Sequence, residues 1–160
     1  GYSISLNRPG PFDIEKAKQN LVPMPCWSPL QKQEHYEYDG KLYTRDMILG
    51  PERKGLKLTY CTDTRPTDLI AMCAKDSDLF ICEGMYGEDG KEEKAREHKH
   101  MTMYEAAELA KRAEVKQMWL THYSPSLVHP EQYESKVKKI FANTVISRDG
   151  RSCELMFEEN

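Results

Sequence analysis

Apolar residues in the second half of the chain recur in short runs that alternate with amphipathic segments. Runs typical of buried strands lie at 56–62, 78–82 and 116–121. Residues 66–75 have helical periodicity, and Thr102 with Glu105 has the spacing of a capping box that opens a further helix. Strands that alternate with helices predict an α/β layer architecture.

The end of the chain carries two more predicted features. Pro130 suits the first turn of a helix that continues to about Phe141. The turn Asp149-Gly150 separates the segments 143–147 and 151–157, and this pattern predicts a closing hairpin.

The first 55 residues have a different pattern, rich in Pro and Tyr, which predicts mostly loops. One short helix is expected at 13–20, with Asp13 as its N-cap. The segment "HYEYDGKLYTR" alternates around Asp39-Gly40 and predicts a hairpin. We expect a single domain over 1–160, in which 1–55 is an arm-like segment and 56–160 is the α/β part.

Composition narrows the classes of partner. Twenty-three Lys and Arg against 26 Asp and Glu give a net charge of −3, which excludes nucleic-acid binding through general positive charge. Five cysteines without a CxxC pair favour a reducing cytoplasm. No apolar run is long enough to predict a signal peptide or a membrane span. A chain of this size needs no metal to fold, so a metal would serve chemistry.

Three ionisable residues follow predicted strands directly: Asp63, Glu83 and His122. If these strands are neighbours in one sheet, the three side chains converge at one edge, where α/β folds collect active sites. His100 lies two residues before the capping box, where a carboxylate such as Glu83 could fix its tautomer. Helix caps or satisfied polar side chains are the alternative interpretation of each residue taken alone.

A family resemblance rests on the order and spacing of four motifs. The run "LTYCTDTRP…AKDSDLFICEGMY…HKHMTMYEAAELAKRAEVKQMWLTHYS" resembles the second half of ribonuclease Z, a branch of the metallo-β-lactamase fold. The corresponding family pieces read approximately "SGDTRP", "ADLLIHEATF", "HST" and "LTHFS". The resemblance implies an αββα sandwich, of which this chain would form the C-terminal half together with an arm segment.

The resemblance also implies roles for the four ionisable residues. Asp63 would bridge two zinc ions and His122 would ligate one of them. Glu83 and His100 would act as a catalytic pair, with His100 assisting the departing 3′ oxygen of a phosphodiester. The substrate would be precursor tRNA or another RNA, and the complete enzyme would be a cytoplasmic homodimer.

Two departures from the family pattern bear on this interpretation. "CEGMY" stands where the family has "HEATF", and such changes around the phosphate site affect substrate identity more than reaction type. The motif HxHxDH, which supplies most of the zinc ligands, is absent from the sequence. We therefore expect a missing N-terminal half, or a second chain that carries HxHxDH, and an isolated chain that is inactive.

The arm segment is expected to bind RNA through a few local contacts. Residues 1–55 hold eight bases and seven acids, so contacts with backbone phosphate would come from a few bases such as Lys16, Lys18 and Lys32, with Trp27 or Tyr36 stacking on a base. A packing or dimer-contact arm is the alternative. For the whole protein, the alternatives are a metallo-β-lactamase-fold hydrolase of another small phosphodiester or ester, and a non-catalytic subunit that binds a partner.

Overall fold

The computed structural model describes residues 1–158 and divides the chain into two compact units. The first, called here the sheet unit, contains residues 1–6 and 56–157. The second, called here the arm unit, consists mostly of residues 7–55. The boundary coincides with the change of sequence pattern at residue 55. No helix among the described residues is long and apolar enough to cross a membrane.

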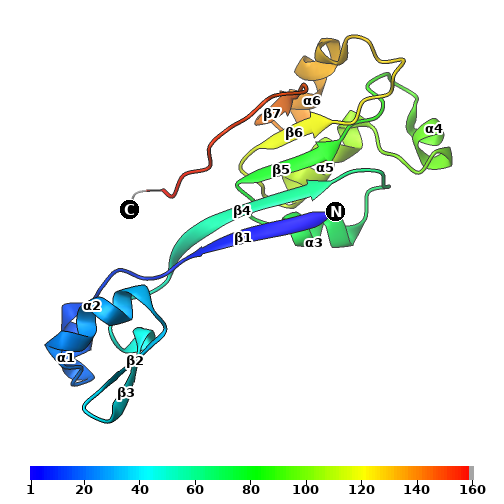
Figure 1. Ribbon diagram of the computed structural model, residues 1–160. Helices are drawn as coiled ribbons and strands as arrows, with labels where there is room; N and C mark the ends of the chain where they lie inside the picture. The colour runs from blue at the N-terminus through cyan, green and yellow to red at the C-terminus, as the bar shows by residue number, and fades with distance from the viewer. Residues whose placement is uncertain (159–160) are drawn as a thin grey trace. The chain divides into compact units, whose positions relative to one another are not determined.

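The sheet unit is built on a five-stranded sheet with the strand order β1-β4-β5-β6-β7 (Figure 1). The strands are β1 (Tyr2–Arg8), β4 (Arg53–Cys61), β5 (Leu79–Glu83), β6 (Met118–Thr121) and β7 (Thr144–Ile146). Each of the last four pairs in parallel with its neighbour. The expected α/β architecture is confirmed, and the carboxyl ends of β4, β5 and β6 lie side by side.

Helices connect the parallel strands. They are α3 (Asp68–Ala74), α4 (Glu92–Glu97), α5 (Met103–Arg112), and the 3₁₀ turn η2 (Pro130–Tyr133) that leads into α6 (Glu134–Ile140). The capping box before α5 forms as expected, because the Thr102 side chain accepts from the Glu105 N–H and the Glu105 side chain accepts from the Thr102 N–H. The beginning of α5 is therefore fixed by local bonds.

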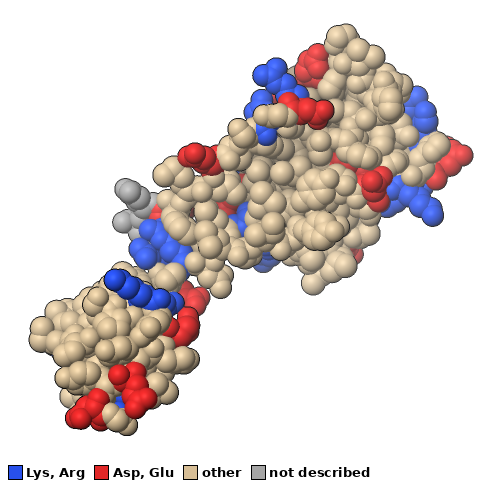
Figure 2. All heavy atoms as spheres, in the orientation of Figure 1, with Lys and Arg blue, Asp and Glu red and all other residues tan. Residues whose placement is uncertain are grey.

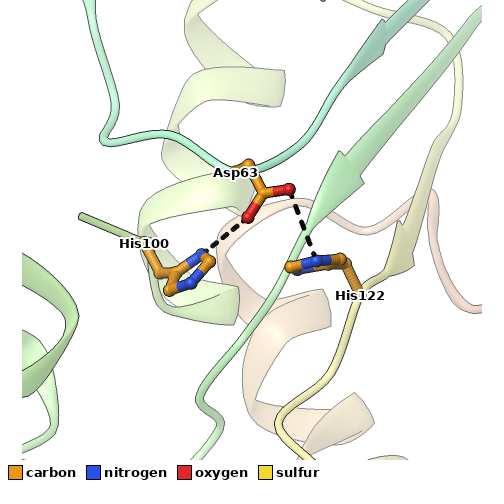
Figure 3. A group of neighbouring side chains, drawn as sticks. All are labelled: Asp63, His100 and His122. Atoms are coloured by element: carbon orange, nitrogen blue, oxygen red, sulfur yellow. Dashed lines mark ion pairs between the residues drawn. The ribbon is translucent and has the colours of Figure 1, made fainter. Parts of the chain in front are cut away.

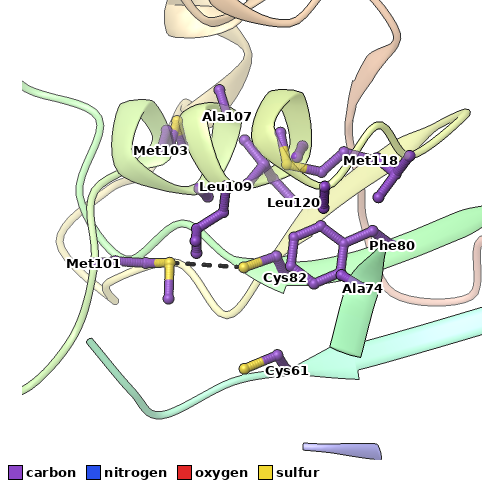
Figure 4. Close-up of a cluster of buried hydrophobic side chains, with 14 of the residues drawn as sticks. Cys61, Ala74, Phe80, Cys82, Met101, Met103, Ala107, Leu109, Met118 and Leu120 are labelled. Carbon is purple, nitrogen blue, oxygen red and sulfur yellow. Dashed lines mark hydrogen bonds between the residues drawn. The ribbon is translucent and has the colours of Figure 1, made fainter. Parts of the chain in front are cut away.

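The main core lies between α5 and one face of the sheet (Figure 4). Small residues on α5, such as Ala107, let the helix approach the strands closely, and Leu109 fills the space between them. Phe80, Met118 and Leu120 supply the strand side of this core and are completely buried. Because side chains alternate along a strand, their neighbours in sequence face the other way.

The opposite face of the sheet is not covered by these helices. Ser3 contacts Thr59 on the helix side, so Tyr2, Ile4 and Tyr60 lie on the other face. There Tyr2 is 73% exposed and Ile4 65% exposed. Figure 2 shows few charged side chains over the middle of this unit. The sheet unit thus has an apolar face that we call the open face.

The arm unit has a small core of its own. Its elements are α1 (Ile14–Gln19), α2 (Met24–Lys32), the hairpin strands β2 (His35–Tyr38) and β3 (Lys41–Thr44), and the 3₁₀ turn η1 (Arg45–Met47). The predicted first helix and the hairpin around Asp39-Gly40 are both present. Buried side chains from every part of the unit meet in its centre: Ala17, Val22, Cys26, Leu30, Tyr43 and Ile48.

The prediction that one short helix is the only regular helix of this region is wrong. The segment expected to turn at "VPMPCWSP" forms α2, which has Pro25 in its first turn and Pro29 in its interior. Pro25 has no N–H to leave unpaired there. Cys26 and Leu30 lie one turn apart and are both completely buried, so core packing offsets the cost of Pro29.

The predicted closing hairpin is also wrong. The turn at Asp149-Gly150 forms, and the Arg151 N–H donates to the Arg148 carbonyl at 3.1 Å. No strand follows among residues 151–158, and β7 instead pairs in parallel with β6. The Arg151 guanidinium instead lies over the Trp119 ring of β6, 5.5 Å from its centroid.

Candidate active site

Three side chains converge beyond the carboxyl ends of the central strands (Figure 3). Asp63 follows β4, His122 follows β6, and His100 precedes α5. His122 Nε2 lies 3.7 Å from Asp63 Oδ2, and His100 Nδ1 lies 3.9 Å from Asp63 Oδ1. The two imidazole rings are 5.5 Å apart between centroids. The convergence follows from the register, in which Cys61 lies beside Cys82 and Glu83 beside Thr121.

Two of these residues have an uncommon backbone conformation. Asp63 and His122 both have a φ of 55°. This left-handed region is sparsely used by residues with a side chain, although Asp and His tolerate it better than most. Such a conformation persists where surrounding contacts fix it, and it clusters at functional sites. Beside His122, the Ser124 N–H donates to the Met85 carbonyl at 2.9 Å.

Glu83 is the completely buried member of the site. Its Oε1 accepts from the Thr64 N–H at 2.6 Å. Its Oε2 lies 2.9 Å from His100 Nδ1 and accepts from the Met101 N–H at 3.3 Å. These donors offset the cost of removing a carboxylate from water. With Nδ1–H directed at Glu83, the Nε2 atom of His100 is the ring nitrogen left for chemistry.

The donor set fits a transition metal such as zinc. The ligand atoms of Asp63, His100 and His122 lie within 4.8 Å of one another. Because Nδ1 of His100 is bonded to Glu83, Asp63 and His122 are the two side chains of this group that are free to ligate a metal. Carboxylate oxygen and imidazole nitrogen are zinc ligands, and closed protein sites use four of them. Cys82 does not extend the set, because burial raises the pKa of its thiol well above the usual value and its Sγ contacts Met101 Sδ at 3.6 Å.

The structure therefore brings together the four residues that the sequence singled out: Asp63, Glu83, His100 and His122. Arg65 was not predicted as part of the site, and its guanidinium donates to the His100 carbonyl at 2.5 Å. Its signal is the "DTRP" motif, which does not identify a partner for the arginine. Thr64 was missed as well, since its contribution is a backbone N–H that no sequence pattern marks.

The four predicted RNA-binding residues lie in the arm unit. Lys16 Nζ donates to the Leu49 carbonyl at 2.7 Å. The Trp27 indole N–H donates to the Val22 carbonyl, and its ring lies against Phe12 with centroids 5.3 Å apart. Both side chains thus have structural partners within the unit.

The other two residues of this set are more exposed. Lys18 forms an ion pair with Glu15 at 3.0 Å, in which both side chains are more than half exposed. Lys32 is exposed in the last turn of α2. Exposed ion pairs of this kind contribute little, so Lys18 is free to exchange partners. Lys18 and Lys32 are thus more exposed than Lys16 and Trp27.

Comparison with known proteins shows the family by sequence and a similar fold by structure. A family model described as "Beta-lactamase superfamily domain" matches residues 9–123. The ribonuclease Z of Lachnospira eligens is 59% identical over 99% of this chain and 52% of that protein. The ribonuclease Z of Agathobacter rectalis is 54% identical over 100% of this chain and 53% of that protein. The chain thus spans about half the length of these curated relatives.

One solved structure supports the fold. The metallo-β-lactamase fold protein YhfI from Bacillus subtilis matches with a TM-score of 0.50 and 22% identity. The match covers 56% of this chain and 35% of that protein. At this identity the likeness concerns the fold alone, and it agrees with the α/β topology of the sheet unit.

Proposed function

Because the chain belongs to the family of the β-lactamase superfamily domain, we propose that its site is half of the active site of a metal-dependent phosphodiester hydrolase. The proposed metal is zinc, with two ions in the complete protein, and the proposed substrate is precursor tRNA. The main support for this proposal is the convergence of Asp63, His100 and His122 beside buried Glu83. The ribonuclease Z relatives, which match over the whole chain, support the choice of reaction.

Asp63 and His122 would hold the metal in this proposal. Their side chains are 72% and 36% exposed, so both are accessible to an ion and to further ligands. Zinc supplies Lewis acidity toward a phosphate oxygen and lowers the pKa of water when bound. A carboxylate is suited to offset the charge of two cations, as the resemblance implies for Asp63.

Glu83 and His100 would move the proton. The buried carboxylate of Glu83 fixes the Nδ1–H tautomer of His100 and orients the ring. Nε2 would then give a proton to the departing 3′ oxygen of the RNA. Three hydrogen-bond donors hold Glu83 in place, and it would act on the reaction through His100 rather than by touching the substrate.

The rest of the site would come from the part of the relatives that lies outside this chain. The open face of the sheet, with exposed Tyr2, Ile4 and Leu6, is an apolar surface of the kind that packs against a second layer. We infer that the other half, which carries HxHxDH, covers it and completes an αββα sandwich. A homodimer of the complete protein is part of the proposal. The free cysteines support a cytoplasmic setting.

A second candidate substrate, a small phosphodiester, is favoured by the arm unit itself. Lys16 and Trp27 are engaged by partners within the unit, so fewer groups remain for RNA than the sequence indicated. Figure 2 shows acidic as well as basic side chains on the arm unit. The reaction would be the same and only the leaving group would differ.

The test separates the metal ligand from the proton donor in the complete protein. His122→Ala should lower both metal content and cleavage of precursor tRNA. His100→Ala should leave the metal bound and slow single-turnover cleavage by roughly 10²–10⁴. Glu83→Gln should resemble His100→Ala, and the double variant should be little worse than either, because residues acting as a unit are non-additive.

Metal analysis and single-turnover kinetics on the same preparations decide the outcome. Zinc lost from His100→Ala, or additive effects of the Glu83 and His100 changes, would contradict the assigned roles. His129→Ala is the matched control, because His129 is an exposed histidine whose partner is Glu131. It should change neither metal content nor rate.

A further inference from the structure

We propose that Arg65 is a positioning residue, a latch that ties the loop of Asp63 to the segment carrying His100. The latch is a property of the fold, while its value for catalysis rests on the proposed function of these two residues. Arg65 Nη1 donates to the His100 carbonyl at 2.5 Å and to Glu105 Oε2 at 3.0 Å. Nη2 donates to Glu105 Oε1.

The geometry uses what is particular to arginine. The planar guanidinium meets the Glu105 carboxylate with both of its terminal nitrogens, and one of these also reaches a backbone carbonyl. A lysine ammonium on a flexible stem has no second nitrogen to share between the two acceptors. Arg65 is 26% exposed and Glu105 is 22% exposed, so solvent weakens the pair less than it would at the surface.

Glu105 is itself a fixed anchor. Its Oε2 also accepts from the Thr102 N–H at 2.9 Å as part of the capping box of α5. Burial would raise the pKa of Glu105, but the hydrogen bonds from Arg65 and Thr102 outweigh it and hold the pKa below its usual value. The carboxylate thus stays charged, and the latch is anchored to the beginning of a helix rather than to a loop.

The Asp63 loop needs such anchors because of its backbone. Asp63 has a left-handed φ, which relaxes unless neighbouring contacts fix it. Thr64 is fixed on buried Glu83, and Arg65 is fixed on Glu105 and on the His100 carbonyl. Thr64 and Arg65 follow Asp63 directly in the chain, and both are bonded to Glu83 or to the segment of His100. These bonds therefore set the 3.9 Å separation of Asp63 Oδ1 and His100 Nδ1.

A purely structural role for Arg65 makes a different prediction. If Arg65 only stabilised the capping box, its loss would loosen α5 and leave the Thr64 bond to Glu83 intact. A latch instead predicts that the two N–H groups held by Glu83, those of Thr64 and Met101, open together when Arg65 is removed. Amide hydrogen exchange measures such local opening directly.

The first experiment is amide exchange by NMR on the 160-residue chain. Arg65→Ala should speed exchange at Thr64 and Met101 by roughly ten- to a hundredfold, as expected for a lost hydrogen bond to a charged group. Gly84, whose N–H donates to the Thr121 carbonyl, is the internal reference and should not change. Arg65→Lys should give a smaller effect at the same amides, and it serves as the test if Arg65→Ala fails to fold.

Arg112→Ala is the matched control, since Arg112 forms an exposed ion pair with Asp68 on the same unit. It should leave the exchange rates of the Thr64 and Met101 amides unchanged. Equal acceleration at Thr64, Met101 and Gly84, or no acceleration at any of them, would overturn the latch. Acceleration confined to the amides at the beginning of α5 would overturn it as well, in favour of the structural role.

The second experiment uses the complete protein and bis-p-nitrophenyl phosphate. With zinc supplied in excess, because the loop that Arg65 holds also carries the proposed ligand Asp63, Arg65→Ala should lower kcat at least roughly tenfold with KM unchanged, since it misplaces groups that act in the chemical step. Active protein in which Arg65→Ala leaves kcat unchanged overturns the proposal. A complete protein with no phosphodiesterase activity, whose exchange pattern still follows the latch, refutes the proposed function and leaves the latch standing.

Discussion

Glu83 is the residue on which the local geometry of the site depends. Its carboxylate joins the loop after β4 to the segment before α5 through three donors. Asp63, Glu83 and His122 could be predicted from the sequence, because each lies at the carboxyl end of a predicted strand and parallel strands end at the same edge. The donors to Glu83 could not be predicted, since two of them are backbone N–H groups whose directions depend on the folded loops.

Gly84 follows Glu83 and has little room for a side chain. An added Cβ would lie 2.9 Å from Met103 Cγ and 3.1 Å from Leu120 Cδ2. We predict that Gly84→Ala lowers the free energy of unfolding by about 1–3 kcal/mol through overpacking, measured by urea denaturation. This position is an alanine in the "HEATF" pattern, so the constraint comes from the large buried side chain of Met103.

The double variant tests that explanation. In a Met103→Ala background, Gly84→Ala should leave the free energy of unfolding unchanged or raise it, because the added methyl group then enters a cavity. Gly50→Ala is the control, since an added Cβ there meets nothing closer than 3.5 Å. If Gly84→Ala lowers the free energy of unfolding equally with and without the Met103 side chain, overpacking against Met103 is not the cause.

Helix α5 shows how far local sequence fixes an element. Its capping box and its apolar stripe are local signals, and both form as predicted. Helix α2 was missed because Pro25 and Pro29 are local signals against a helix, while Cys26 and Leu30 are buried by partners distant in sequence. Local patterns decide an element only where its tertiary contacts agree with them.

The beginning of α5 should carry a pH-dependent part of the stability. Although burial would raise the pKa of Glu105, the hydrogen bonds from Arg65 and Thr102 hold it below the ordinary value of a glutamate carboxyl. The stabilisation is therefore present above the unfolded pKa and is lost as the pH falls through the folded pKa. We predict that Glu105→Gln lowers the free energy of unfolding by roughly 1–2 kcal/mol at pH 7 and by progressively less below pH about 4.

Urea denaturation of both proteins from pH 7 to pH 3.5 gives the difference curve. Glutamine keeps a capping side chain at this position, so the helix itself should form in the variant. Glu108→Gln removes a carboxylate from an exposed position of the same helix and is the control. A cost of Glu105→Gln that is constant with pH would refute the assignment to the carboxylate charge.

At the scale of the whole molecule, the division into two units makes the arm removable. Residues 7–55 have their own core, and the sheet unit has a separate one. We predict that deletion of residues 8–50 from the complete protein weakens cleavage of precursor tRNA but spares bis-p-nitrophenyl phosphate, because remote binding energy serves only the large substrate. A short Gly-Ser linker should replace the deleted segment, since β1 and β4 are neighbours in the sheet.

Kinetics on both substrates distinguish the outcomes. Equal loss on both would mark the arm unit as structural, and no loss on tRNA would favour the small phosphodiester. Lys18→Ala with Lys32→Ala should reproduce part of the deletion. Lys16→Ala instead should lower the stability of the arm unit, because Lys16 donates to the Leu49 carbonyl.

The exposure of the open face is expected to differ between the 160-residue chain and the complete protein. Ile4 is 65% exposed, so Ile4→Lys should leave the free energy of unfolding of the 160-residue chain within about 0.5 kcal/mol of its original value. Because an exposed apolar face favours association, we expect the 160-residue chain to self-associate and Ile4→Lys to reduce that association. If a second layer covers this face in the complete protein, the same change should cost about 2–4 kcal/mol there, because a charge is buried without a partner. Ser5→Lys, on the other side of the same strand, is the control and should be mild in both proteins. Analytical ultracentrifugation and urea denaturation measure the two effects, and a complete protein that tolerates Ile4→Lys as well as Ser5→Lys would show that this face stays in water.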